Sequence, residues 1–126
     1  MPSNQSDGGS TPRKKKFALY EEKAADYFRE QGFVIVERNW RSGHKEIDLI
    51  VQKESLLVFA EVKSSNGEKF GHPSERVDNR KQKHLTLAAQ AFILSRQIEK
   101  VDLRFDVITF MNGKLEHYPN AFPASE

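Results

Sequence analysis

The apolar residues follow a helical repeat in two parts of the chain. Between Phe17 and Gln31 they fall on one face of a helix, and Gly32 is suited to end it. Between Asn79 and Gln97 a second stripe of the same period predicts a second helix. The apolar positions are Phe17, Ala24, Ala25 and Phe28 in the first stripe and Leu85, Ala88 and Phe92 in the second.

Five further segments have the apolar and β-branched composition of strands. Only residues 53–55 separate the second segment from the third, which predicts a hairpin. Asn112-Gly113 is a strong hairpin signal between the last two segments. The segments are FVIVERNW at 33–40, EIDLIVQ at 46–52, LLVFAEVK at 56–63, VDLRFDVITF at 101–110 and KLEHY at 114–118.

The second and third strands are apolar on both faces. Simple alternation places Ile47, Leu49 and Val51 on one face of the second strand and Ile50 on the other. Strands of this kind are usually covered on both sides. The order of one helix, three strands, one helix and two strands therefore predicts an α/β fold, with a mixed central sheet flanked by helices.

The length of 126 residues suits one domain with its own core. Residues 1–16 contain almost no apolar side chain, so we expect a disordered tail there, a folded domain at 17–122 and a short C-terminal tail at 123–126. Gly67, Gly71 and Pro73 predict a loop before the second helix.

The basic charge is concentrated in the N-terminal tail. The tail carries +3, and the rest of the chain carries −1 of the net charge of +2. The run could contact a phosphate backbone, or it could simply keep the chain soluble. Its basic residues are Arg13, Lys14, Lys15 and Lys16, set against Asp7.

Several classes of protein are excluded by composition. The chain has no cysteine, which excludes a disulfide scaffold, a thiolate zinc site and a cysteine nucleophile. No apolar run approaches the roughly 20 residues of a membrane span, and no secretory h-region is present at the N-terminus. We therefore expect a cytoplasmic protein that does not bind membranes.

Charged residues interrupt the apolar pattern at five core-facing positions. Asp48, Glu61 and Lys63 lie on the second and third strands, while Glu21 and Lys81 lie on the helical stripes. Buried charges are normally paired or bound to metal. One reading is a partly buried ion pair of Lys63 with Asp48 or Glu61, with the two helical residues reaching solvent.

The other reading is a metal site. Three acids and two bases suit a hard divalent cation such as Mg²⁺, which prefers carboxylate oxygens and retains several waters. Such a metal would polarise a phosphate and lower the pKa of a bound water. Lys63 would then orient that water or stabilise charge in the transition state.

Several motifs, in order, resemble those of one family. The chain between Phe17 and Phe122 is similar to the YraN-type bacterial proteins (uncharacterised protein family 0102), which are grouped with the restriction-endonuclease-like PD-(D/E)xK nucleases and resemble archaeal Holliday-junction resolvases. Lys45 stands where the family usually has glycine, Tyr20 where glycine is frequent, and no proline precedes Asp48. The motifs are YEEKAADYF, NWRSGHKEIDLI, VFAEVKSS, FGHPSERVDNRKQKHL and RFDVITF.

The resemblance implies an α-β-β-β-α-β core and a role for each residue. Asp48, Glu61 and the Val62 carbonyl would hold Mg²⁺, for which Mn²⁺ can substitute, and Lys63 would be the catalytic lysine. Glu21 would be a ligand through water. Nucleic acid would be contacted by Lys81, by Lys45 and by the tail residues Arg13, Lys14, Lys15 and Lys16.

Three functions follow from these patterns. The first is a metal-dependent endonuclease acting on DNA, including branched or structured DNA, and similarity to resolvases adds the expectation of a homodimer. The second is a non-catalytic nucleic-acid-binding module that retains the fold. The third is a structural or protein-interaction role with an internal ion network. Glu46, Arg104 with Asp106, and the histidines are read as surface or ion-pair residues.

Overall fold

The computed structural model describes residues 12–65 and 77–125, and it confirms both helices and all five strands. Each element agrees with its predicted span to within two residues at either end, except at the start of the first helix. Neither helix of the described ranges is long and apolar enough to cross a membrane. The elements are α2 (Pro12–Glu30), β1 (Val34–Ser42), β2 (Lys45–Lys53), β3 (Leu56–Ser65), α4 (Asn79–Arg96), β4 (Asp102–Met111) and β5 (Lys114–Tyr118).

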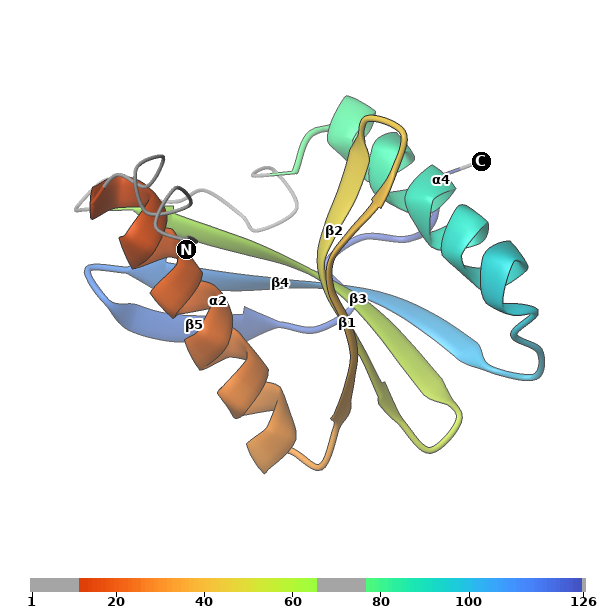
Figure 1. Ribbon diagram of the computed structural model, residues 1–126, viewed down its shortest axis with the longest axis horizontal. Coiled ribbons are helices and arrows are strands. Elements are labelled where there is room, and N and C mark those ends of the chain that lie inside the picture. The colour runs from red at the N-terminus through yellow and green to blue at the C-terminus, as the bar shows by residue number, and fades with distance from the viewer. Residues whose placement is uncertain (1–11, 66–76, 126) are drawn as a thin grey trace, which may run out of the picture.

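The strands form one mixed sheet in the order β1-β2-β3-β4-β5 (Figure 1). Neighbouring strands are antiparallel except β3 and β4, which run parallel from Leu56 opposite Asp102 to Ser65 opposite Met111. Parallel strands need a long crossover connection, and the segment that contains α4 provides it. Tight turns with positive φ at Glu54 and at Asn112 and Gly113 close the two predicted hairpins.

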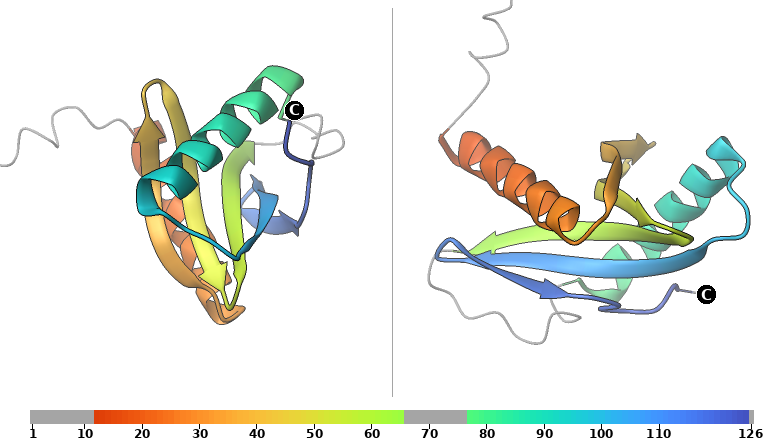
Figure 2. Two further views of the ribbon diagram at one scale, coloured as in Figure 1. Left: turned by 90° about the vertical axis from the view of Figure 1, so that its right-hand side faces the viewer. Right: turned by 90° about the horizontal axis from the view of Figure 1, so that it is seen from below.

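The helices cover opposite faces of the sheet. In the left-hand view of Figure 2 the strands lie between α4 in front and α2 behind. Two apolar clusters fill these layers, and side-chain alternation along the strands assigns successive residues to one or the other. The α4 cluster includes Leu57, Phe59, Leu85 and Phe92; the α2 cluster includes Ala24, Phe28, Val58 and Phe110.

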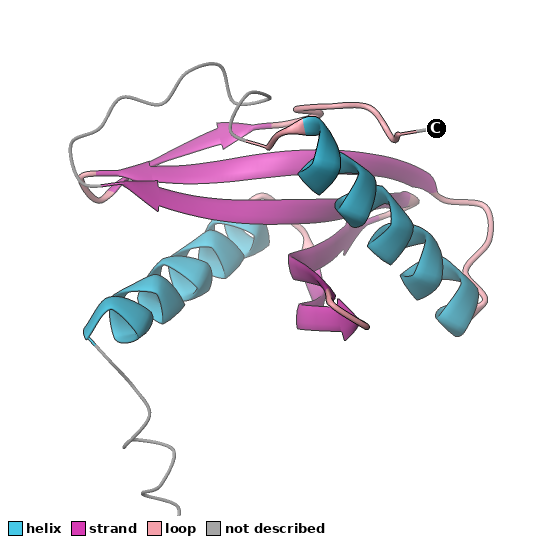
Figure 3. Ribbon diagram, turned by 90° about the horizontal axis from the view of Figure 1, so that it is seen from above, coloured by secondary structure: helices cyan, strands magenta, loops and turns pink. Residues whose placement is uncertain are grey.

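The sheet divides where β2 leaves β3. The two strands pair from Leu49 to Lys53 of β2 but not before Leu49, while β2 remains paired with β1 down to Lys45. In Figures 1 and 3, β1 and β2 turn steeply away from the direction of β3, β4 and β5. This divergence explains why simple alternation was wrong for Ile47, which packs with Ile50 in the α4 cluster and not with Leu49.

The first helix begins earlier than predicted, and the C-terminal segment is attached to the domain. Helix α2 begins at Pro12, as suits proline in a first turn, so residues 12–16 are helical although we expected them to belong to the disordered tail. At the other end, the backbone N–H of Ser125 donates to Thr86 Oγ1 at 3.0 Å, which attaches the C-terminal segment to α4. The rest of the predicted tail, residues 1–11, and most of the predicted loop, residues 66–76, lie outside the described residues.

Candidate active site

Asp48 lies at the point where β2 and β3 separate. It directly precedes Leu49, the first residue of β2 that pairs with β3. Its Oδ2 accepts a hydrogen bond of 2.8 Å from the backbone N–H of Val62, so the carboxylate occupies a position that a ladder hydrogen bond would otherwise fill. The divergence of the strands therefore places this side chain against the backbone of the Glu61-Val62-Lys63 element.

Glu61 is buried, with 5% of its side chain exposed. One carboxylate oxygen, Oε2, lies 3.4 Å from the Nζ atoms of both Lys63 and Lys81. The other, Oε1, is buried without a hydrogen-bond partner among the described residues. Leaving a buried acceptor unpaired costs about 1–3 kcal/mol, so Glu61 is held in an unfavourable state.

The carboxylates repel one another electrostatically. Burial raises the pKa of Asp48 from 3.8 to about 8, and the negative charge of Glu61 acts in the same direction. The hydrogen bond from Val62 opposes this rise but does not cancel it. A carboxylate with such a raised pKa would gain from a nearby cation, because positive charge favours its ionised form.

Glu21 approaches from α2 through a third residue. Its Oε2 accepts a hydrogen bond of 3.1 Å from the side-chain amide of Asn39 on β1. Burial raises the pKa of Glu21, the Asn39 hydrogen bond lowers it, and the charges of Glu46 and Glu61 raise it further. Glu21 is therefore near enough to feel the same negative potential as the strand carboxylates.

Four of the five predicted core-facing charges are brought together by direct contacts or by β3. Lys63 forms the ion pair with Glu61 that the first reading predicted, and its role beside a metal stays a prediction. Lys81 reaches Glu61 from the first turn of α4. Glu46 pairs with Arg41 at 3.2 Å, as expected of a strand-end carboxylate.

The other residues expected to contact nucleic acid lie on β2 and α2. Within the described ranges, Lys45 at the start of β2 forms no salt bridge. The four basic residues of the tail, Arg13 to Lys16, belong to the first turns of α2. They extend the helix that carries Glu21 rather than leading into it as a free arm.

The donor set fits a hard divalent cation. Carboxylate and carbonyl oxygens are the ligands that Mg²⁺ prefers, and the unpaired Glu61 Oε1 is an acceptor that a cation would satisfy. No three His, Cys, Asp or Glu side chains of residues 12–65 and 77–125 are already gathered into a ligand cluster. A cation held by Asp48 and Glu61 would therefore reach Glu21 through a bound water, an arrangement that keeps the hydrogen bond between Asn39 and Glu21.

A second buried carboxylate, Asp106, was read from the sequence only as the partner of Arg104. Arg104 indeed binds it through two hydrogen bonds of 2.8 and 2.9 Å. His117 Nε2 donates to it at 2.7 Å, and the backbone N–H of Asn120 donates at 3.0 Å. Tyr27 then bonds His117 Nδ1 at 2.9 Å, a contact between residues 90 positions apart that no local spacing signals.

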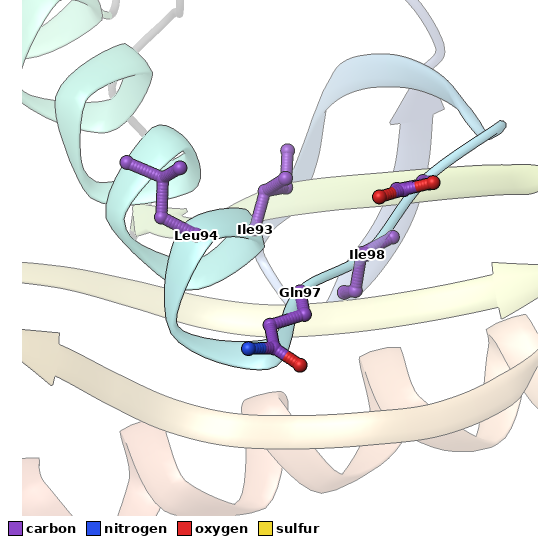
Figure 4. A pocket seen from close by; sticks show the side chains of 5 residues that line it. Ile93, Leu94, Gln97 and Ile98 are labelled. Atoms are coloured by element: carbon purple, nitrogen blue, oxygen red, sulfur yellow. The ribbon is translucent and has the colours of Figure 1, made fainter.

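A pocket lies at the far end of α4 from the carboxylates (Figure 4). Lys81 and Ile93 are separated by roughly 18 Å along the helix at its ordinary rise. The side chains in the pocket are mainly apolar and include no cluster of acids, so the pocket is not part of the candidate site. It is lined by Ile93, Leu94, Gln97, Ile98 and Glu99.

The element order and the positions of the acids define a class of protein. The α-β-β-β-α-β order, with Asp48 at the separation of two strands and Glu-x-Lys on the second of them, is that of a restriction-endonuclease-like α/β protein. Asp48 lies against the Glu61-Val62-Lys63 element, and the roles that the resemblance implies for these residues stay predictions.

Comparison with known proteins gives the family. The sequence model that describes the uncharacterised protein family UPF0102 matches residues 20–110 of this chain. A UPF0102 protein of Persephonella marina is 38% identical over 102 residues, which cover 81% of this chain and 88% of that protein. A UPF0102 protein of Chloroherpeton thalassium is 43% identical over 91 residues, covering 72% and 70%. The chain belongs to UPF0102, the YraN-type family.

Proposed function

We propose that the protein is a metal-dependent endonuclease that hydrolyses phosphodiester bonds in DNA. The observation that carries the proposal is the pairing of Asp48 with the Glu61-Val62-Lys63 element, where one carboxyl has a pKa raised to about 8 and the other has a buried, unpaired oxygen. Two adjacent acids in this state are a poor structural ion network but a suitable cation site.

The resemblance supplies a role for each residue, and the contacts around Glu61 support it. Asp48, Glu61 and the Val62 carbonyl would hold Mg²⁺ or Mn²⁺, with Glu21 contributing through water. When bound, the metal polarises the phosphate and lowers the pKa of a bound water. Lys63, released from Glu61 Oε2, would orient the attacking water or stabilise the charge that develops on phosphate.

Lys81 would contact the substrate. Its side chain is 41% exposed and reaches Glu61 from the first turn of α4, so a cation on Glu61 would free the ammonium group for a phosphate. DNA, including branched DNA, is the substrate class that the family resemblance favours. The second candidate is a nucleic-acid-binding module without turnover, which the ion pairs of Glu61 with Lys63 and Lys81 favour because they satisfy part of its charge without a metal.

The test is cleavage of labelled duplex, single-stranded, flap, fork and four-way-junction DNA with Mg²⁺ or Mn²⁺. We expect the wild type to cut at least one substrate and Asp48→Asn to lose at least about a hundredfold in rate. Asp26→Asn is a matched control, because Asp26 is an exposed acid of α2 that forms an ion pair with Arg29. Metal binding without cleavage of any substrate would instead favour the binding module.

The basic residues of the first turns of α2 give a separate prediction. Because residues 12–16 are helical, deletion of the tail would also shorten α2, so we would replace Arg13, Lys14, Lys15 and Lys16 by alanine, which keeps the helix. If these side chains contact phosphates, the slope of log affinity against log salt becomes shallower by about 0.9 for each lost contact on duplex DNA. Fluorescence anisotropy at several salt concentrations measures it, and an unchanged slope contradicts the contact.

A further inference from the structure

One amide connects two of the acids around the candidate site. The side-chain Nδ2 of Asn39 donates to Glu21 Oε2 at 3.1 Å and to Glu46 Oε2 at 3.2 Å. These acids come from α2 and β2, so a single residue of β1 joins three elements. An amide NH₂ has two hydrogens, and here each can serve one carboxylate.

Asn39 on β1 lies opposite Asp48 on the neighbouring strand β2. Its neighbours Arg38 and Trp40 pair with Leu49 and Ile47, which places Asn39 level with Asp48 in the β1–β2 ladder. The φ angle of Asn39 is +50°, in the left-handed region that asparagine tolerates better than most residues. The backbone therefore departs from the ladder at this residue, next to the candidate metal ligand.

The chemistry of an amide suits this position. Two carboxylates that share a donor repel each other less, yet a neutral amide leaves their negative charge intact for a cation. Lysine or arginine would neutralise that charge, as Lys63 and Lys81 do at Glu61. Hydrogen bonds that orient metal ligands are commonly worth 10–100-fold in metal affinity.

We propose that Asn39 is a positioning residue that holds Glu21 in place to serve the metal. This inference rests on the proposed metal-dependent function. The alternative is that asparagine is present only because the backbone needs a residue that accepts positive φ. Glycine separates the two explanations, because it adopts this conformation freely but has no amide side chain.

The experiment measures Mn²⁺ affinity by calorimetry in the full chain. Asn39→Gly should weaken binding about tenfold through loss of the hydrogen bond to Glu21. Arg96→Ala is the matched control, since Arg96 also connects a helix to β1, but through a hydrogen bond to Glu37 that involves neither Glu21 nor Asp48. We expect the control to retain wild-type affinity within about twofold, because neither Arg96 nor Glu37 takes part in the proposed site.

A double-mutant cycle with Glu21→Gln tests whether Asn39 acts through Glu21. If it does, Asn39→Gly should not weaken Mn²⁺ binding further in the Glu21→Gln background. Equal affinity in wild type and Asn39→Gly, or additive losses in the double variant, would overturn the inference while leaving the metal site intact. Absence of Mn²⁺ binding by the wild type would overturn the proposed function together with this inference.

Discussion

Two acidic clusters lie on the same sheet and differ in how fully their carboxylates are hydrogen-bonded. Asp106 is fully buried and accepts hydrogen bonds from Arg104, His117 and the Asn120 backbone. Among the described residues, Asp48 accepts one hydrogen bond, from the Val62 N–H, and its neighbour Glu61 keeps a buried oxygen without a partner. The fold can therefore satisfy a buried carboxylate completely, and at the separation of β2 and β3 it does not.

The pKa values express the same difference. Burial alone would raise the pKa of Asp106, but hydrogen bonds from His117, Arg104 and Asn120 lower it below its ordinary value. Burial and the charge of Glu61 raise the pKa of Asp48 to about 8. A carboxylate with a raised pKa, such as Asp48, costs free energy that other contacts in the fold must offset. Such groups are found at functional sites more often than at structural ones.

The largest expected effect comes from removing the satisfied acid. Asp106→Ala leaves Arg104 and His117 facing a partly buried space without their acceptor, and we expect a loss of about 3 kcal/mol in the free energy of unfolding. Urea denaturation followed by circular dichroism measures this loss. A change below about 1 kcal/mol would show that the Asp106 cluster is not a structural centre and would remove the contrast.

The next prediction concerns the free energy of unfolding as a function of pH, to which Asp48 and Asp106 contribute with opposite signs. The folded chain holds a proton on Asp48 between pH 3.8 and about 8 that the unfolded chain has lost, so stability from this group falls as pH rises through that window. Asp106 has a lowered pKa, so its contribution is present above its unfolded pKa and is lost as pH falls. At pH 9 we expect Asp48→Asn to be more stable than the wild type by about 1–3 kcal/mol.

The pH prediction is checked by unfolding both proteins between pH 4 and pH 9. The difference between wild type and Asp48→Asn should grow with pH, because asparagine keeps an oxygen acceptor for Val62 but carries no charge. Asp26→Asn, at an exposed position, provides the control and should follow the wild-type curve. Parallel curves for Asp48→Asn and wild type would mean that Asp48 is not strained.

Sequence patterns predicted the site of Asp48 and Glu61 better than the cluster around Asp106. Asp48, Glu61 and Lys63 were found because each breaks an apolar strand, and this local conflict is visible in sequence alone. Asn39 gave a weaker signal, a residue of low strand propensity inside a β-branched run, which could have indicated an irregular strand. The Tyr27–His117 contact spans 90 positions, so periodicity could not predict it.

Tertiary geometry also explains the misplaced residues. Alternation failed at Ile47 because β2 pairs with β3 only from Leu49, and no pattern within one strand reports where its neighbour leaves. Tyr20 was noted only as a departure from a glycine, yet it is buried and stacks on Phe110 with ring centroids 4.5 Å apart. The sequence predicted the helices and strands, whereas the separation of β2 from β3 determined the face on which Ile47 lies.

A smaller effect is expected at the edge of the Asp106 cluster. His117 Nε2 bonds the Asp106 carboxylate, and Nδ1 on the other side of the ring lies 2.9 Å from the Tyr27 hydroxyl, to which it is hydrogen-bonded. Tyr27→Phe removes only that hydroxyl, so we expect a loss of about 1 kcal/mol in the free energy of unfolding. Thermal and urea unfolding measure it, and Tyr118→Phe, an exposed hydroxyl bonded to Glu116, is the control. Equal losses in both variants would contradict a structural role for the partly buried hydroxyl of Tyr27.

The smallest change in stability should come from the most buried acid of the candidate site. Glu61→Gln removes ion pairs to two lysines whose side chains are 33% and 41% exposed, and these lysines can be solvated by water instead. It also removes the negative charge of a buried carboxylate whose Oε1 has no hydrogen-bond partner among the described residues. Loss of the ion pairs destabilises the folded chain and loss of the buried charge stabilises it, so the two effects offset each other. Without metal, we expect the free energy of unfolding to change by less than about 1 kcal/mol.

With metal, the same substitution should have its full effect. Mn²⁺ in excess stabilises a folded chain that binds it, and Glu61→Gln should lose that stabilisation, whereas Glu37→Gln, in the exposed pair with Arg96, should keep it. Differential scanning fluorimetry with and without Mn²⁺ separates the two contributions. A large loss of stability without metal would assign Glu61 to an ion network like that of Asp106. A nearly neutral substitution that abolishes the metal response would mean that Glu61 is retained for a cation, because the fold itself gains nothing from its charge.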